Sequence, residues 1–199
     1  MHGHTKDWDS PESFVQDADD VAALLHNLQI DSALFIGFSN GGQTLLEMGI
    51  RHPAIVRKLV IISAFYKRNG LLPGFFEGMQ HATIGNMPAL LKSTYLEIPG
   101  NDENGLQAMF ERDKQRMLHF KDWNDEDLHA IKAPALVIAA NRDVATIQHT
   151  VEMSQKIPNA FLVILPGTNG SFIGELCTEQ AGSKIPAITV ALVEDFLGR

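Results

Sequence analysis

The stretch ALFIGFSNGG, residues 33–42, decides the fold of this chain. Its first half, Ala33–Gly37, is an apolar run that is too short for a helix and typical of a strand covered on both faces. Residues 41–52 have helical character, and Pro53 ends them because proline cannot continue a helix. The stretch therefore predicts a strand, a tight turn around Ser39 and a helix.

Strands and helices alternate along most of the remaining sequence. Ser10 can cap a first helix, and Pro11 suits its first position. This helix has an apolar stripe that ends before the turn at residues 30–32. The stripe predicts that the helix lies on a sheet. The alternation implies a parallel sheet with right-handed crossovers, so the predicted fold class is α/β, a parallel sheet flanked by helices. The other expected strands are Lys58–Ile62, Ala135–Ala139 and Phe161–Leu165, and the other expected helices cover residues 147–156 and 186–197.

Residues 64–127 break this alternation. They hold four of the seven methionines and five of the eleven phenylalanines. We therefore expect a helical insertion at 64–127 within a core formed by residues 1–63 and 128–199. Two interpretations of its apolar side chains stay open: a core of the insertion itself, or the lining of an apolar ligand pocket.

The overall composition argues against several classes of protein. Sixteen Lys and Arg against twenty-four Asp and Glu give a net charge of −8, without a basic block that would suit a nucleic-acid partner. No apolar run is long enough to span a membrane, and the first residues lack the pattern of a secretion signal. Cys177 is the single cysteine, which fits a reducing compartment. We expect a cytoplasmic protein with a small-molecule partner.

The chemistry of the chain is concentrated at the turn after the first strand. Gly37, Ser39 and Gly41 match the pattern G-x-S-x-G between a strand and a helix, the context in which this pattern marks a nucleophile elbow. Bulky neighbours would clash on such a strained turn, which accounts for the glycines. Ser39 is the candidate nucleophile, and the backbone N–H of Asn40, at the start of the helix, is the candidate oxyanion donor.

These features resemble the α/β-hydrolase family, in its branch of small esterase-like and lactonase-like enzymes with a helical cap. Arg51–Val56 is similar to the passage after the nucleophile helix, and Ala133–Asp143 to the strand whose end carries the catalytic acid. Pro166–Ser171 is similar to the loop that carries the catalytic histidine. The resemblance implies a serine hydrolase of carboxylic esters or related small acyl substrates, with Ser39 as nucleophile, Asp143 as acid and the insertion as the cap.

The sequence departs from the family pattern at the histidine. Asn169 stands at its position, and no histidine occurs after His149. An amide cannot take a proton from serine at neutral pH, and loss of the base from such a triad lowers kcat by about 10⁶ in subtilisin. The hydrolase is therefore expected to be impaired. The alternative is a catalytically inactive, hydrolase-like protein with a ligand-binding or regulatory role.

A second departure lies at the first residues, where His2–Thr5 resembles the family's G-H-G-x-S/T stretch. In a full-length member of the family, this stretch follows the strand two before the nucleophile elbow. The resemblance therefore implies that about a third of the domain is absent, including the loop that donates the second oxyanion N–H. The family's strand order would then leave Ala33–Gly37 at a sheet edge. Because a flat apolar edge strand invites pairing with another chain, we expect a homo-oligomer through this edge.

The remaining titratable residues receive lesser roles. His149 is a candidate substitute for the missing base, although its place within an expected helix favours a surface or capping role. Asp143 has the alternative role of capping the helix that starts near Ile147 or of forming a turn before it. His2 and His4 lack the further ligands that a metal site needs, and no phosphate-binding glycine motif occurs, so neither a metal nor a cofactor is expected.

Overall fold

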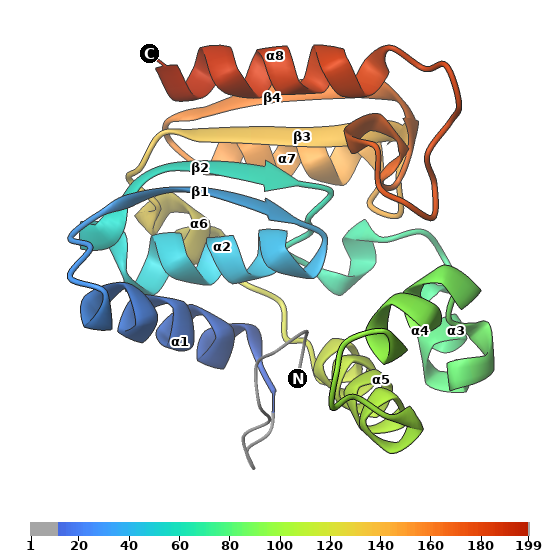
Figure 1. Ribbon diagram of the computed structural model, residues 1–199. Helices are drawn as coiled ribbons and strands as arrows, with labels where there is room; N and C mark the ends of the chain where they lie inside the picture. Colours follow the sequence, from blue (N-terminus) through green and yellow to red (C-terminus); the bar gives the residue numbers. More distant parts are fainter. Residues whose placement is uncertain (1–11, 199) are drawn as a thin grey trace. The chain divides into compact units, whose positions relative to one another are not determined.

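A computed structural model of the chain describes residues 12–198 (Figure 1). The chain forms two compact units: a sheet unit of residues 14–73 and 121–198, and a helical unit of residues 74–120 together with Glu12 and Ser13. The helical unit contains fewer residues than the insertion expected at 64–127, because residues 64–73 and 121–127 belong to the sheet unit.

The expected strands and the helices that follow them are present, with ends that differ by a few residues. None of the helices of residues 12–198 is long and apolar enough to cross a membrane. The helical unit contains α3 (Phe75–His81), α4 (Ala89–Leu96) and α5 (Glu103–Leu118). The sheet unit contains α1 (Phe14–Asn27), β1 (Ala33–Phe38), α2 (Asn40–Arg51), β2 (Val56–Ile62), α6 (Asp125–Ala130), β3 (Ala135–Arg142), α7 (Ile147–Lys156), β4 (Ala160–Thr168) and α8 (Ile185–Gly198).

The four strands form one parallel sheet in the order β1-β2-β3-β4, which confirms the predicted fold class. Val60 of β2 pairs with Ile36 of β1 on one side and with Leu136 of β3 on the other. β4 pairs along β3, beginning with Ala160 opposite Ala135. Because all four strands run in the same direction, the residues that follow them lie together at the carboxyl ends of the strands. This carboxyl edge of the sheet is where α/β proteins bind their ligands.

Helices cover both faces of this sheet (Figure 1). α2 and α7, with α6 between them, lie on one face, where a Cβ atom on Gly49 of α2 would stand 3.1 Å from the side chain of Leu59. α8 lies on the other face, where Phe196 joins a buried cluster that contains Val60. The ammonium group of Lys58 ties this helix to β2, because it donates hydrogen bonds to the last carbonyl groups of α8.

α1 packs against α2, so the expectation that it lies on the sheet is wrong (Figure 1). Phe14 and Ala18 of its apolar stripe are buried, whereas Leu28 is 59% exposed. The physical reason is that α2 already occupies the face of β1 and β2 on that side. The helix start expected at Ser10 and Pro11 lies outside the described residues.

β1 is an edge strand of the described sheet, and one of its faces is uncovered. Leu34 and Ile36 are 40% and 58% exposed, so the expectation of cover on both faces is wrong for this strand. Ile36 shares a face with its register partner Val60, which is the face on which α8 lies. Because α8 packs over β2, β3 and β4, its cover does not extend to the middle of β1.

Self-association through β1 stays a prediction. We expect light scattering at tens of micromolar to show particles larger than a monomer, because an uncovered apolar edge strand offers N–H and C=O groups to another chain. Ile36→Lys should return the protein to a monomer, since a charge on the edge opposes pairing. Leu176→Lys, at a loop residue that is 63% exposed, should leave the association unchanged. A clean monomer of the unaltered chain at these concentrations would contradict the prediction.

The helical unit has a small core of its own. Tyr95 of α4 packs with Leu106 and Met109 of α5, and Met87 lies against this cluster. Asp102 caps α5, because its side chain accepts a hydrogen bond from a backbone N–H of the first turn. Of the two interpretations of the apolar side chains in the insertion, the core interpretation therefore holds for Met87 and Met109.

Candidate active site

Ser39 occupies the tight turn between β1 and α2 in a conformation that serine rarely adopts. Its φ of 52° and ψ of −119° lie in the positive-φ region, which costs a residue other than glycine about 1–3 kcal/mol. The turn is held by hydrogen bonds from the Ser39 N–H to the Ile62 carbonyl (2.9 Å) and from the Gly42 N–H to the Ser39 carbonyl (2.7 Å). The hydroxyl makes no capping bond to α2, so the turn presents this group rather than using it as a helix cap.

Close packing explains two of the glycines in this stretch. A Cβ atom on Gly37 would stand 2.3 Å from the carbonyl oxygen of Gly41, and one on Gly42 would stand 2.8 Å from the Cβ atom of Ala64. A Cβ atom on Gly41 meets no atom within 4 Å. The expectation that the motif glycines avoid clashes is therefore correct for Gly37 and wrong for Gly41, because the space beside Gly41 is open.

Asn40 is the first residue of α2 and directly follows Ser39. The first N–H groups of a helix have no carbonyl partner within the helix, and the helix dipole makes this end electropositive. Such an N–H group stabilises the oxyanion that forms when a serine attacks a carbonyl carbon. The role of Asn40 as an oxyanion donor stays a prediction, and its position suits that role.

Asp143 follows β3 at the carboxyl edge of the sheet and is 4% exposed. Its Oδ2 atom accepts hydrogen bonds from the Ser63 hydroxyl (2.6 Å) and the Ala140 N–H (3.0 Å). Its Oδ1 atom accepts hydrogen bonds from the Val144 N–H (2.8 Å) and the Asn169 side-chain amide (2.8 Å). Four donors thus converge on a buried carboxyl group, which needs such partners to be buried at all.

The alternative role of Asp143, as the cap of α7, is wrong. Thr146 caps that helix, because its hydroxyl oxygen accepts a hydrogen bond from the N–H of His149. Asp143 lies three residues earlier, and its carboxyl group is directed to the contacts at the sheet edge instead.

Asn169 lies just beyond β4 and contacts the candidate acid directly. Its Nδ2 atom donates a hydrogen bond to Oδ1 of Asp143 over 2.8 Å. A triad histidine makes the equivalent bond to its acid through Nδ1–H. The second ring nitrogen of histidine, which exchanges a proton with the serine, has no counterpart in asparagine. The contact between the acid and residue 169 is therefore present, and the proton acceptor is not.

Ser63 is a site residue that the sequence pattern did not indicate. It follows β2, is 2% exposed and has a φ of 52°. Its neighbour Ile62 accepts the N–H of Ser39, while the Ser63 hydroxyl donates to Asp143. This short segment therefore joins the candidate nucleophile to the candidate acid. The available signal was a serine directly after a buried strand, at the edge where a parallel sheet places its functional groups.

His149 is buried, so the surface role expected for it is wrong. It is 5% exposed, the N–H of Tyr66 donates to its Nε2 atom over 3.1 Å, and the two rings stack with centroids 4.4 Å apart. A Cβ atom on Gly70 would stand 2.1 Å from the ring, so this glycine lets the chain pass directly against it. Because its Nε2 lone pair is engaged, His149 is unsuited to replace the missing base and instead anchors the segment after β2.

His149 is expected to make the stability of the protein depend on pH. Burial is the main cause that lowers its pKa to about 4; Lys67 adds to the shift, and Glu152 and Asp122 oppose it. An unfolded histidine titrates near pH 6.5, so between about pH 6.5 and 4 the unfolded chain binds a proton that the folded chain does not. This contribution is complete above pH 6.5 and is lost as the pH falls toward 4, by about 2 kcal/mol at pH 5.

Urea unfolding at pH 7 and pH 5 measures this effect. His149→Gln keeps an oxygen that can accept the Tyr66 N–H and does not titrate. The fall in unfolding free energy between the two pH values should therefore be smaller for this variant, by about 2 kcal/mol. Equal falls for both proteins would show that His149 does not cause the dependence.

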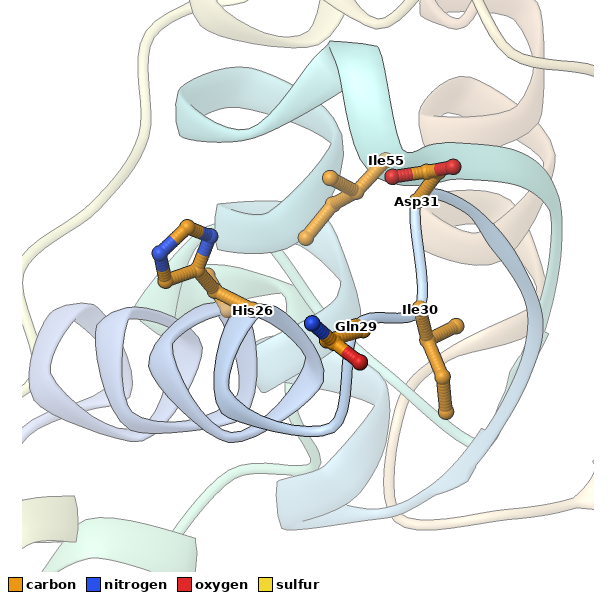
Figure 2. Close-up of a pocket in the computed structure, with 6 residues that line it drawn as sticks. His26, Gln29, Ile30, Asp31 and Ile55 are labelled. Carbon is orange, nitrogen blue, oxygen red and sulfur yellow. The ribbon is translucent and has the colours of Figure 1, made fainter.

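A pocket of about 370 Å³ lies at the opposite end of β1 (Figure 2). The strand separates it from Ser39 by roughly 20 Å, at about 3.3 Å for each residue. The pocket is therefore no part of the candidate active site. It is lined by Ala22, His26, Gln29, Ile30, Asp31 and Ile55.

The residues weighed as metal ligands, His2 and His4, lie outside the described residues, as does the whole stretch His2–Thr5. Within residues 12–198, no three His, Cys, Asp or Glu side chains gather in a way that could hold a metal ion.

Known proteins are similar to this chain in sequence. The chain is 29% identical over 180 residues to the AB hydrolase superfamily protein YisY of Bacillus subtilis (strain 168), an alignment that covers 79% of this chain and 67% of that protein. No protein-family model matches the chain.

Several solved structures share the fold. The enol-lactonase from Burkholderia xenovorans LB400 matches with a TM-score of 0.68 and 23% identity, covering 100% of this chain and 78% of that one. Est816, an N-acyl homoserine lactone degrading enzyme, matches with a TM-score of 0.70 and 23% identity, covering 98% and 79%. MGS-M2, an alpha/beta hydrolase from a Medee basin deep-sea metagenome library, matches with a TM-score of 0.73 and 20% identity, covering 99% and 76%.

These structural matches show the fold, and the similarity to the Bacillus protein extends over most of the chain. The parallel sheet, the strained serine after β1 and the acid after β3 stand in the order Ser, then Asp, that α/β-hydrolases use. The chain therefore has the α/β-hydrolase fold and is similar in sequence to a protein of the AB hydrolase superfamily.

Proposed function

We propose that this chain is a serine hydrolase of carboxylic esters or related small acyl compounds that works without a histidine base. The proposal rests on the carboxyl ends of the strands, where a strained Ser39 follows β1 and a buried acid, hydrogen-bonded to the residue at the base position, follows β3. The likeness to an enol-lactonase and to a lactone-degrading enzyme supports an acyl substrate.

In this proposal the Ser39 hydroxyl oxygen attacks the acyl carbon, the alcohol leaves, and water then hydrolyses the acyl-enzyme. The Asn40 N–H stabilises the oxyanion of each step. Asn169 cannot accept the serine proton, so water or hydroxide must take it. The rate should therefore be low and should rise with pH. A site of this kind without its base retains about 10³–10⁴-fold acceleration over water through the oxyanion hole and substrate binding.

Turnover of p-nitrophenyl acetate and butyrate tests the proposal. The unaltered chain should hydrolyse both esters slowly, faster at pH 9 than at pH 6, and Ser39→Ala should abolish this turnover. Mass spectrometry after exposure to the ester should find an acyl group on Ser39, because deacylation is slowed as well. Equal rates for the two proteins, together with an unmodified Ser39, would contradict the proposal.

The second candidate function is a hydrolase-like protein that binds a ligand without turning it over. Asn169 favours it, because the acid is occupied by a side chain that cannot move a proton. Under this alternative, the unaltered chain and Ser39→Ala are equally inactive, yet both bind a non-hydrolysable amide analogue of the ester in calorimetry. Ser39-dependent turnover excludes this candidate.

We also propose a cytoplasmic location. The exposed thiol of Cys177, the single cysteine of the sequence, supports it. A reducing compartment keeps such a thiol free, whereas an oxidising compartment would favour disulfides between copies of the chain. Fractionation of the producing cells tests the location.

A further inference from the structure

Ser63 lies between the candidate nucleophile and the candidate acid, and we propose that it is a positioning residue for Asp143. The proposal deepens the serine-hydrolase function and rests on it. Ser63 acts through the acid, by fixing which carboxyl oxygen faces residue 169, and does not itself touch the substrate.

The first observation is how the two carboxyl oxygens are divided. Oδ2 of Asp143 is held by the Ser63 hydroxyl at 2.6 Å and by the Ala140 N–H at 3.0 Å. Oδ1 faces Asn169. Ser63 and Asp143 are 2% and 4% exposed, so water does not compete for this contact. Together with the backbone N–H groups of Ala140 and Val144, the Ser63 hydroxyl therefore fixes the rotation of the carboxyl group and so directs Oδ1 toward residue 169.

The second observation is the backbone conformation of Ser63. Its φ of 52° is one that glycine adopts without strain and serine does not. Strained residues persist where the surrounding structure fixes them, and here the Ser63 N–H donates to the Ile138 carbonyl over 2.8 Å. This conformation brings the Ser63 hydroxyl onto the acid. The strain is therefore coupled to a contact within the proposed site.

The third observation connects Ser63 to the nucleophile. The residue before it, Ile62, accepts the N–H of Ser39 over 2.9 Å. The bonds thus run without a gap from Ser39 through the Ile62–Ser63 segment to Asp143 and on to Asn169. Ser63 sets the position of the acid relative to the serine that it serves.

Nuclear magnetic resonance of the chain as it stands provides the first test. The side-chain amide signal of Asn169 is assigned by its loss in Asn169→Ala. Ser63→Ala should shift this signal and raise its exchange with solvent by about tenfold, because the carboxyl group loses one of its two donors on Oδ2, turns more freely and binds the amide less strongly. An unchanged Asn169 signal would overturn the proposal.

Two variants separate this effect from a general loss of structure. Ser154 is also buried, and its hydroxyl donates to the Val151 carbonyl, so Ser154→Ala removes a comparable bond remote from the acid and should leave the Asn169 signal unchanged. Ser63→Gly removes the hydroxyl and relieves the positive φ, so it should fold at least as well as Ser63→Ala and show the same change. A native Asn169 signal in Ser63→Gly would mean that strain, and not the hydroxyl, was responsible, and would overturn the proposal.

Kinetics in the Asn169→His background provide the second test. Ser63→Ala should lower kcat on p-nitrophenyl butyrate by about tenfold with KM unchanged. The acidic limb of the pH profile should move to lower pH, because a carboxylate that has turned away from residue 169 stabilises the imidazolium less. An active Asn169→His chain in which Ser63→Ala changes neither quantity would overturn the proposal. An Asn169→His chain without Ser39-dependent turnover contradicts the hydrolase function alone, because the amide signal decides the role of Ser63 without turnover.

Discussion

Asn169→His is expected to raise the Ser39-dependent hydrolysis of p-nitrophenyl butyrate by at least about 10³-fold in kcat/KM. Asn169 already donates to Asp143 through Nδ2, the bond that a histidine makes through Nδ1–H. A histidine there adds the Nε2 atom that takes the proton of Ser39 and returns it to the leaving group. Loss of the base lowers kcat by about 10⁶ in subtilisin, so even partial restoration gives a large gain.

Two further variants interpret the result. Asn169→Ala should change the rate of the unaltered chain little, because the amide it removes does not transfer protons. Asn169→His combined with Ser39→Ala should be inactive, which ties the gain to the serine. If Asn169→His stays within about tenfold of the unaltered chain, the missing base does not limit the reaction, and the assignment of residue 169 to the base position loses its support.

Gly37→Ala should destabilise the protein by more than about 4 kcal/mol or prevent it from folding. Its Cβ atom would stand 2.3 Å from the carbonyl oxygen of Gly41, far inside van der Waals contact. That oxygen belongs to the backbone of α2 and cannot rotate away, so the start of the helix must move as a whole. Urea unfolding followed by circular dichroism measures the loss.

Gly41→Ala is the matched control, because it makes the same change four residues later, in the first turn of α2. Its Cβ atom meets no atom within 4 Å, and alanine favours a helix over glycine by up to about 1 kcal/mol. The unfolding free energy should therefore stay level or rise slightly. A loss as large as that of Gly37→Ala would show that the two positions do not differ in packing.

Local patterns predicted the elements of the fold well and their surroundings less well. Ile147–Lys156 is a helix with the expected bounds, and the four strands begin within two residues of their expected starts. The uncovered face of β1 and the packing of α1 on α2 were not predicted. Periodicity shows which side of an element is apolar, whereas the element that covers that side is set by the three-dimensional arrangement.

The same division applies to the candidate site. Ser39 was predicted because its turn is specified by neighbouring residues, and the contact between Asp143 and Asn169 agrees with the family resemblance. Ser63 was missed because its hydroxyl meets a residue eighty positions later in the chain. His149 was placed on the surface because a helix with one histidine does not reveal that Tyr66 stacks on it. Contacts between distant segments determine both residues.

The order of the strands also bears on how the sheet assembles in time. β1 and β2 are close in the chain, as are β3 and β4, but more than seventy residues separate the end of β2 from the start of β3. The entropy lost on closing a flexible loop grows with its length, so the pairing of β2 with β3 is expected to be the slowest step of sheet growth. When the helical unit first folds around its core at Tyr95, its residues are no longer flexible, and the flexible part of the loop between β2 and β3 becomes shorter. The rate at which the two halves of the sheet meet is then set by a segment that contributes no strand to it.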